Sequence, residues 1–268
     1  MANMLIDDRD LIQPENKATR IPVVLCLDTS GSMDNNGSCG FNGLNLGVKT
    51  FYNTCKNDSA HKYGFDVAIV TFGNQGVKKY QDFRPIWNDD EIPSFSFDSS
   101  NWIDGTPLGR GIDLAMQGLQ KRKNEYKENG IGYYQPWLVI ITDGQPTFGQ
   151  RDLETGGYAI TEEEDMAAYV KTQTDILELQ RNKKLWVIAV GVGDEDYSQL
   201  ANFVIDKKVL VMEDFSAFDL VFEFLSKSMS ASSDMGAGSN VSPLAMVQED
   251  LEDEGVSISI EEFGRDED

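Results

Sequence analysis

Four apolar, β-rich runs separated by helical patterns constrain this chain more than any other feature of its sequence. They cover residues 21–27, 65–72, 137–142 and 185–190. An uninterrupted run of this kind is typical of a strand that is buried on both faces, as in parallel sheets. Because stretches with helical periodicity join the runs, we predict an α/β fold. Its Rossmann-like, doubly wound, mostly parallel sheet carries helices on both faces.

The segments between these runs complete the predicted fold. Apolar residues at helical spacing predict a helix through residues 44–55, a second beginning near Thr106, and others over residues 162–182, 197–203 and 215–229. Residues 77–83 follow a glycine-containing turn, which predicts one short antiparallel strand at a sheet edge. Residues 209–212 are predicted as the last strand of the sheet.

Composition divides the chain into three parts. Residues 1–18 are polar and aperiodic, residues 19–230 carry the alternating pattern, and residues 231–268 are first rich in Ser, Gly and Ala and then strongly acidic. We predict one folded domain over 19–230 and a flexible linker with a disordered acidic tail over 231–268. Within the tail, residues 256–260 alternate apolar and polar side chains and are able to pair as a strand with a partner edge.

The chain is strongly acidic, with 45 Asp and Glu against 23 Lys and Arg and a net charge of -22. This charge argues against nucleic-acid binding, which needs cations to neutralise phosphates, and against docking on anionic membranes. The first residues show no basic segment followed by an apolar one, and the three cysteines have no CxxC spacing. We therefore expect a cytoplasmic protein with no nucleic-acid or membrane partner.

Carboxylates and hydroxyls follow the predicted strand ends. Asp28, Ser30 and Ser32 come after the first run, Asp143 comes after the third, and Thr106 lies between them at a predicted helix start. The carboxyl ends of parallel strands form one rim, so we expect these five side chains to lie close together. Asp-x-Ser-x-Ser alone also serves as a turn or helix cap, but its place after a buried strand favours a shared site.

These five side chains are all hard oxygen donors, with no Cys or His among them. Such a set suits Mg²⁺ or Mn²⁺ rather than Zn²⁺ or Cu²⁺. With only two carboxylates, a bound ion keeps strong Lewis-acid character and an open coordination position. The site is therefore expected to favour a carboxylate from a partner protein.

Asp28-x-Ser30-x-Ser32, Thr106 and Asp143 resemble the metal-ion-dependent adhesion site (MIDAS) of von Willebrand factor type A domains. The segments Asp-Thr-Ser-Gly-Ser-Met, Gly-Thr-Pro-Leu-Gly and Ile-Thr-Asp-Gly-Gln-Pro-Thr are similar to the bacterial TerY-like branch, which is associated with tellurium resistance. The resemblance covers about residues 19–230. It implies a Rossmann-like domain that binds Mg²⁺ and a Glu or Asp of a partner protein. Ser30, Ser32 and Thr106 are then nearest the ion. It also implies stress-response or phage-conflict complexes with kinase or phosphatase partners.

The loop before Thr106 departs from the family pattern. Asp104 stands where small residues are common in the family, and it is interpreted as a turn residue or, alternatively, as an extra metal ligand. Phe95, Phe97 and Trp102 form either a partner-recognition loop beside the metal or packing contacts of a long loop. The acidic tail also lies outside the pattern, and one of its carboxylates is a candidate ligand that blocks the metal in cis.

The residues favour a binding module that is not an enzyme. The sequence contains no GxSxG and no phosphate-binding glycine loop, and the single His61 is far from the candidate site in sequence. The alternative is an Mg²⁺-dependent phosphohydrolase with Asp28 as nucleophile, in which Arg110 is the one cation beside the motifs. A third interpretation is a structural subunit with a vestigial site.

Overall fold

The computed structural model describes residues 18–73, 76–86, 91–96, 105–151, 158–235 and 258–263. The described strands are β1 (Ile21–Thr29), β2 (Phe65–Gly73), β3 (Lys78–Pro85), β4 (Trp137–Thr142), β5 (Gln150–Arg151), β6 (Tyr158–Ile160), β7 (Trp186–Val192), β8 (Lys208–Met212) and β9 (Ile258–Glu262). The α-helices are α1 (Asn35–Asn57), α2 (Leu108–Glu128), α3 (Glu162–Arg181), α4 (Ser198–Ala201) and α5 (Phe218–Met235). Two short 3₁₀ turns, η2 (Gly31–Asp34) and η4 (Phe215–Ala217), precede α1 and α5.

Within the described residues, one seven-stranded sheet has the order β3-β2-β1-β4-β7-β8-β9, and β5 and β6 form a separate small hairpin. The neighbours from β2 through β1, β4 and β7 to β8 are all parallel. The chain moves outward from β1 to β2 and then crosses back to β4. The switch point of this doubly wound sheet therefore lies between β1 and β4.

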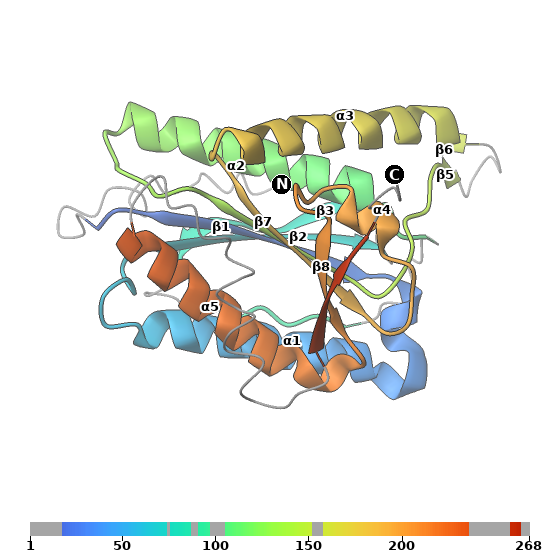
Figure 1. The fold of residues 1–268 in the computed structure, drawn as a ribbon, viewed down its shortest axis with the longest axis horizontal. Coiled ribbons are helices and arrows are strands. Elements are labelled where there is room, and N and C mark those ends of the chain that lie inside the picture. The colour runs from blue at the N-terminus through green and yellow to red at the C-terminus, as the bar shows by residue number, and fades with distance from the viewer. Residues whose placement is uncertain are drawn as a thin grey trace, which may run out of the picture.

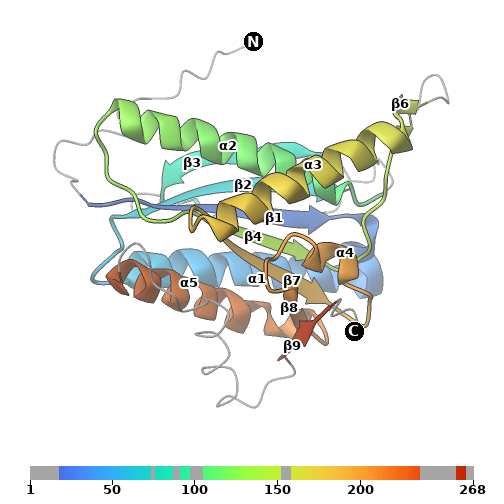
Figure 2. The ribbon, with the colours of Figure 1, turned by 45° about the horizontal axis from the view of Figure 1, so that its top comes forward.

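Helices cover both faces of the sheet (Figures 1 and 2). Alternate residues of β1 divide between the two sides: Val23 and Leu25 pack with α1 and α5, whereas Val24 and Cys26 pack with α2, α3 and α4. β1 and β4 are apolar on both faces because both faces are covered. This arrangement confirms the predicted Rossmann-like fold class.

The sheet differs from the prediction at one edge. We expected a single antiparallel edge strand, and β3 is antiparallel to β2 as predicted. A second antiparallel strand, β9, pairs with β8 at the opposite edge.

The last helix also runs to Met235 rather than ending at residue 229. Residues 231–235 and 258–262 of the predicted flexible tail are therefore part of the folded structure. The remainder of that tail and residues 1–17 lie outside the described residues.

The described part of the chain contains no helix that is both long enough and apolar enough to cross a membrane.

Candidate metal centre

Asp28 is fully buried near the carboxyl end of β1, the strand that borders the switch point. Leu27 pairs with Ile141 of β4, so the next position places Asp28 beside Thr142. The Thr142 hydroxyl donates a hydrogen bond of 2.5 Å to Asp28 Oδ2, and the Ser30 backbone N–H donates one of 2.7 Å to Oδ1. Both carboxylate oxygens are held in place, which fixes the orientation of the group.

A chain of hydrogen bonds joins Ser30, Ser32 and Asp143. Ser32 Oγ donates to Asp143 Oδ1 at 2.7 Å, and the Ser30 and Ser32 hydroxyl oxygens are 2.8 Å apart. A serine hydroxyl carries only one proton. Ser32 gives its proton to Asp143 and so cannot also donate to Ser30, which leaves the lone pairs of Ser30 available to a cation. The structure thus brings Asp28, Ser30, Ser32 and Asp143 together, as the sequence predicts.

Thr106 is placed by its backbone rather than by its side chain. The Thr106 N–H donates to Thr147 Oγ1 at 2.7 Å, and the Thr147 N–H donates to the Thr106 carbonyl at 3.0 Å. Thr147 lies four residues after Asp143, so these two bonds tie the start of α2 to the loop that follows β4. Thr106 is buried, but no hydrogen bond joins its side chain to the other four residues.

Two glycines allow the rim loops to approach one another closely. Gly73, at the end of β2, has a φ of +122°, and a Cβ there would lie 2.4 Å from the Ser30 backbone nitrogen. Gly105 has a φ of +113°, and a Cβ there would lie 2.4 Å from Thr147 Oγ1. A side chain at either position would displace a loop of the candidate site.

Neither carboxylate of the cluster is neutralised by a cation of the described chain. Asp28 and Asp143 take part in none of the ion pairs among the described residues. Burial, followed by the charge of Asp143, raises the pKa of Asp28 to about 7. Burial also raises the pKa of Asp143, and nearby Glu195 adds to this effect. A buried carboxylate beside a half-buried one, without a cation, is unfavourable, because the low local dielectric does not stabilise their charge.

The chemistry of these donors fits a hard divalent cation. The described residues contain no group of three or more His, Cys, Asp or Glu side chains arranged to hold a metal. A MIDAS-type set has only two carboxylates and takes its other ligands from hydroxyl oxygens. It is therefore not a group of this kind. The uncompensated charge of Asp28 and Asp143, beside the unused lone pairs of Ser30, suits Mg²⁺.

Arg110, the one cation beside the sequence motifs, is committed to other partners. Its Nε lies 3.1 Å from Asp165 Oδ1, and its Nη1 donates to Gln150 Oε1 at 2.6 Å. Asp165 also accepts the Gly149 N–H at 2.9 Å and is buried. These contacts attach the segment after β4 to α2 and α3, and the charge of Arg110 is paired with Asp165.

Phe95 does not belong to an exposed recognition loop. Its side chain is buried, its ring lies 4.7 Å from that of Tyr80, and its backbone N–H and C=O are both bonded to the Asn45 side chain. Of the two interpretations of the aromatic loop, packing is therefore the correct one for Phe95. Phe97, Trp102 and Asp104 lie outside the described residues.

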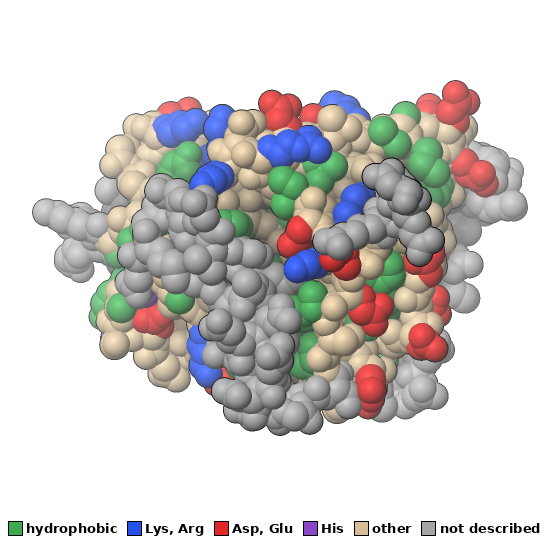
Figure 3. Space-filling model, viewed as in Figure 1, with side chains coloured by type: hydrophobic (Ala, Val, Ile, Leu, Met, Phe, Trp, Pro, Cys, Tyr) green, Lys and Arg blue, Asp and Glu red, His purple; other side chains and the backbone are tan. Residues whose placement is uncertain are grey.

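Acidic side chains are frequent around the carboxyl ends of the strands. Most of those visible in Figure 3 lie on the right half, the end toward which the parallel strands run in Figure 1. Asp194, Glu195 and Asp196 follow β7, and Glu213 and Asp214 follow β8. The candidate centre therefore lies in a negative field, which attracts cations.

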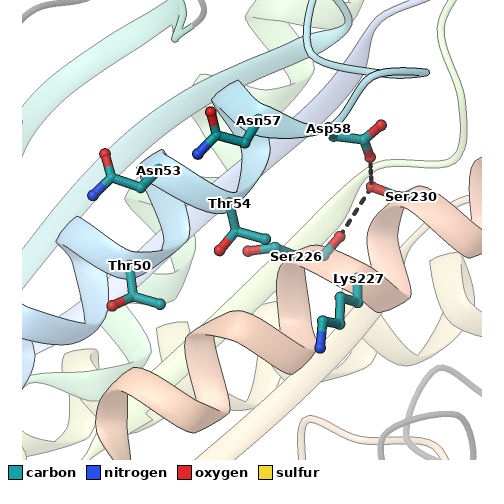
Figure 4. Close-up of a pocket in the computed structure, with 8 residues that line it drawn as sticks. All are labelled: Thr50, Asn53, Thr54, Asn57, Asp58, Ser226, Lys227 and Ser230. Carbon is teal, nitrogen blue, oxygen red and sulfur yellow. Dashed lines mark hydrogen bonds between the residues drawn. The ribbon is translucent and has the colours of Figure 1, made fainter.

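A groove of about 540 Å³ lies between α1 and α5 (Figure 4). Its lining is polar and includes Asn53, Asn57, Lys227 and Ser230. Because α1 begins after the carboxyl end of β1 and returns to the start of β2, Asn57 lies at the amino end of the sheet. The groove is therefore separate from the Asp28 cluster.

Comparison with protein families identifies the family of the domain. The model of the von Willebrand factor type A domain matches residues 23–224, so the chain belongs to this family. A comparison with curated proteins finds no match.

Solved structures show the same fold at low sequence identity. The pilus adhesin SpaC from Lactobacillus rhamnosus GG is 15% identical with a TM-score of 0.53, over 80% of this chain and 31% of that one. The vWF domain of the type V pili tip protein Mfa5 from Porphyromonas gingivalis is 10% identical with a TM-score of 0.51, over 84% of this chain and 99% of that one. This chain thus spans about a third of the length of SpaC. These likenesses concern the fold alone.

Sequence reasoning missed two residues that shape the centre. Thr142 holds Asp28, and its place directly before Asp143 was a signal, but the contact depends on the register of β1 against β4. Thr147 connects the loop after β4 to the start of α2. It lies in the quoted Ile-Thr-Asp-Gly-Gln-Pro-Thr segment, where nothing local indicates its partner.

Proposed function

We propose that this chain is a metal-dependent protein-binding module with no catalytic activity of its own. Asp28, Ser30, Ser32, Thr106 and Asp143 hold Mg²⁺ directly or through water, and Mn²⁺ can replace it. A Glu or Asp side chain of a partner protein completes the coordination. Type A domains commonly mediate protein–protein interaction, which supports the proposed role in protein binding.

One observation carries the proposal. Asp28 is a buried carboxylate and Asp143 a half-buried one, and the two lie beside the Ser30 and Ser32 hydroxyls at the switch point of the sheet, where no cation of the described residues neutralises them. A divalent ion supplies the missing charge. It also leaves an open position, because so few of its ligands are anionic.

The phosphohydrolase alternative is less well supported. A phosphoryl-transfer site needs cationic groups around the phosphate. Arg110 is held by Asp165 and Gln150, and the loops around the centre carry mainly Asp and Glu. In addition, Asp28 is fully buried and both its oxygens accept hydrogen bonds, which is a poor geometry for a nucleophile.

The proposal also includes a cellular compartment and a kind of complex. We place the module in the cytoplasm, in a stress-response or conflict complex of the TerY-like type, with kinase or phosphatase partners. The resemblance of the three motifs supports this setting, and so do Cys26 and Cys55, which are buried and free of disulfides. Identification of the partners is the test of this part.

Two measurements test the module itself. Calorimetry should detect Mg²⁺ binding to the full chain, with loss of at least tenfold in affinity for Asp143→Asn and no change for Asp113→Asn, a half-buried aspartate on α2 that bonds Gln117. A pulldown in Mg²⁺ or EDTA, with wild-type and Thr106→Ala baits, then asks whether partners need the metal. Partners that ignore both EDTA and Thr106→Ala would overturn metal-bridged recognition, and hydrolysis of a phosphoester abolished by Asp28→Asn would favour the alternative.

A further inference from the structure

The outer edge of β8 is covered by a strand from far along the chain. β9 pairs with β8 in antiparallel register from Lys208 opposite Glu262 to Met212 opposite Ile258. The family match ends at residue 224, so β9 lies beyond the part of the chain that defines the domain. Without β9, the edge of the sheet would be β8 itself.

The edge under β9 is apolar and rich in β-formers. Val209 and Val211 belong to the core on one face of the sheet, and Leu210 and Met212 belong to the core on the other. A bare edge of this composition exposes unpaired backbone groups to any extended chain, and proteins normally protect such edges. β8 therefore needs a covering strand.

β9 is held mainly by its backbone pairing with β8, and its own side chains bury little surface. None of its residues is fully buried: Ile258 and Ile260 are half-buried against the core, and Ser259, Glu261 and Glu262 are exposed. Beyond the strand, Phe263 packs against the other core, and its N–H donates to the Lys207 carbonyl at 3.0 Å. β8, in contrast, is buried along four of its five residues.

The connection to β9 is long enough to let it leave. α5 ends at Met235 near the amino end of the sheet, and β9 starts beside Met212 at the carboxyl end. The connection must span about 27 Å, the length of an 18-residue helix at ~1.5 Å per residue. Residues 236–257 can extend to roughly 70 Å at ~3.3 Å per residue. Release of β9 therefore does not require α5 or β8 to move.

We propose that the outer edge of β8 is a docking edge for an extended peptide of a partner protein, and that β9 is the chain's own detachable occupant of that edge. A partner strand adds to the sheet by main-chain hydrogen bonds and displaces β9, as in β-augmentation. This docking edge is distinct from the candidate metal centre and does not depend on it.

β9 also indicates the chemistry of the peptide. It runs antiparallel to β8, places two aliphatic side chains two residues apart toward the core, and sets an acidic residue opposite Lys208. A competing peptide is expected to share this pattern, with an aromatic residue at the position of Phe263. A better aliphatic fit than the half-buried Ile258 and Ile260 would give it the advantage over the tethered strand.

Hydrogen exchange on the full chain tests whether β9 detaches. Amides of residues 258–263 should exchange at least about 100-fold faster than those of β4, because local opening costs less than global unfolding. Equal protection of β9 and β4 would overturn the proposal, because β9 would then be a permanent part of the sheet.

A peptide probe tests the edge itself. The probe is a labelled synthetic copy of residues 257–263, and binding is followed by fluorescence anisotropy. The full-length Ile258→Asp/Ile260→Asp variant, whose β9 cannot pack, should bind the probe at least tenfold tighter than wild type does. The matched variant Ser259→Asp/Glu261→Gln, altered only on exposed positions, should behave as wild type.

The outcomes separate the alternatives. Failure of the probe to bind the Ile258→Asp/Ile260→Asp variant, while that variant keeps a cooperative unfolding transition, would overturn the docking edge. A concentration-dependent dimer of wild type that exchanges β9, detected by light scattering, would also overturn it by assigning the edge to a second copy of this chain.

Discussion

Asp28 and Asp66 are fully buried aspartates on neighbouring parallel strands, but the chain treats them in opposite ways. Asp66 pairs with Pro22 near the start of β1, and Asp28 pairs with Phe72 near its end. The two groups are therefore about 20 Å apart along the strand at ~3.3 Å per residue. One lies at the amino end of the sheet and the other at the carboxyl end.

Asp66 has a cation supplied by the fold. Arg122 Nε and Nη2 both lie 2.7 Å from Asp66 Oδ2, and the Tyr126 hydroxyl donates to the same oxygen. Among the described residues, Asp28 has the Thr142 and Ser30 hydroxyls, a backbone N–H and a second carboxylate nearby, and no cation. The difference indicates that the amino-end aspartate serves stability, whereas the carboxyl-end aspartate lacks an internal cation, which is the role proposed for Mg²⁺.

We expect the largest change in the free energy of unfolding when Arg122, the cation that pairs with Asp66, is removed. Arg122→Met leaves the charge of Asp66 buried and unpaired, and should reduce the free energy of unfolding by about 3–5 kcal/mol. Urea denaturation measures this change. The double variant Asp66→Leu/Arg122→Met removes both charges and should recover most of the loss. A double variant as unstable as the single one would mean that packing of Arg122, rather than its charge, matters.

Addition of Mg²⁺ should have the next largest effect, and it should depend on pH. The raised pKa values of Asp28, about 7, and Asp143 mean that the metal-free fold binds protons more tightly than the unfolded chain does. Their contribution to stability is therefore present below about pH 4 and is lost as pH rises through about 7. Mg²⁺ reverses that loss because it takes the place of the protons.

At Mg²⁺ concentrations of about 100 times the Kd, the stabilisation at pH 8 should be roughly 2.7 kcal/mol. It should be much smaller at pH 5.5, where protons compete for the carboxylates. Thermal denaturation with Mg²⁺ or EDTA at the two pH values measures both quantities. The same Mg²⁺ shift at pH 5.5 and pH 8 would argue that the ion binds elsewhere.

The convergence of Asp28, Ser30, Ser32 and Asp143 was predictable because strand ends meet at one rim whatever the details of packing. Contacts that depend on register or on helix packing were not predictable. The Thr142 bond needs the pairing of β1 with β4, and the Arg110–Asp165 ion pair needs α2 against α3. The pairing of β9 with β8 was open because the alternating pattern of residues 256–260 shows a strand but not which edge it meets.

Thr106→Ala should produce a smaller change, which decides whether Thr106 belongs to the carboxyl-end cluster. If its hydroxyl contacts the ion, the affinity for Mg²⁺ should fall about tenfold, or ~1.4 kcal/mol, with metal-free stability nearly unchanged. Calorimetry measures the affinity. Thr174→Ala, on the exposed face of α3, is the matched control. Equal affinities for both variants would remove Thr106 from the metal centre.

We expect the smallest change in the free energy of unfolding for Asp28→Asn in the absence of metal. This variant tests the comparison of Asp28 with Asp66 most directly. Asp28→Asn keeps the size of the side chain and can still accept the Ser30 N–H, but it removes a buried charge that no cation balances. In EDTA at pH 8, its free energy of unfolding should lie within about 1 kcal/mol of wild type, or rise, because desolvation disfavours the charged form. Asp66→Asn, measured in parallel, should be clearly destabilising because it leaves the buried charge of Arg122 without its partner. A loss for Asp28→Asn as large as that for Asp66→Asn would mean that both aspartates serve stability, and the carboxyl-end cluster would then need no cation to explain it.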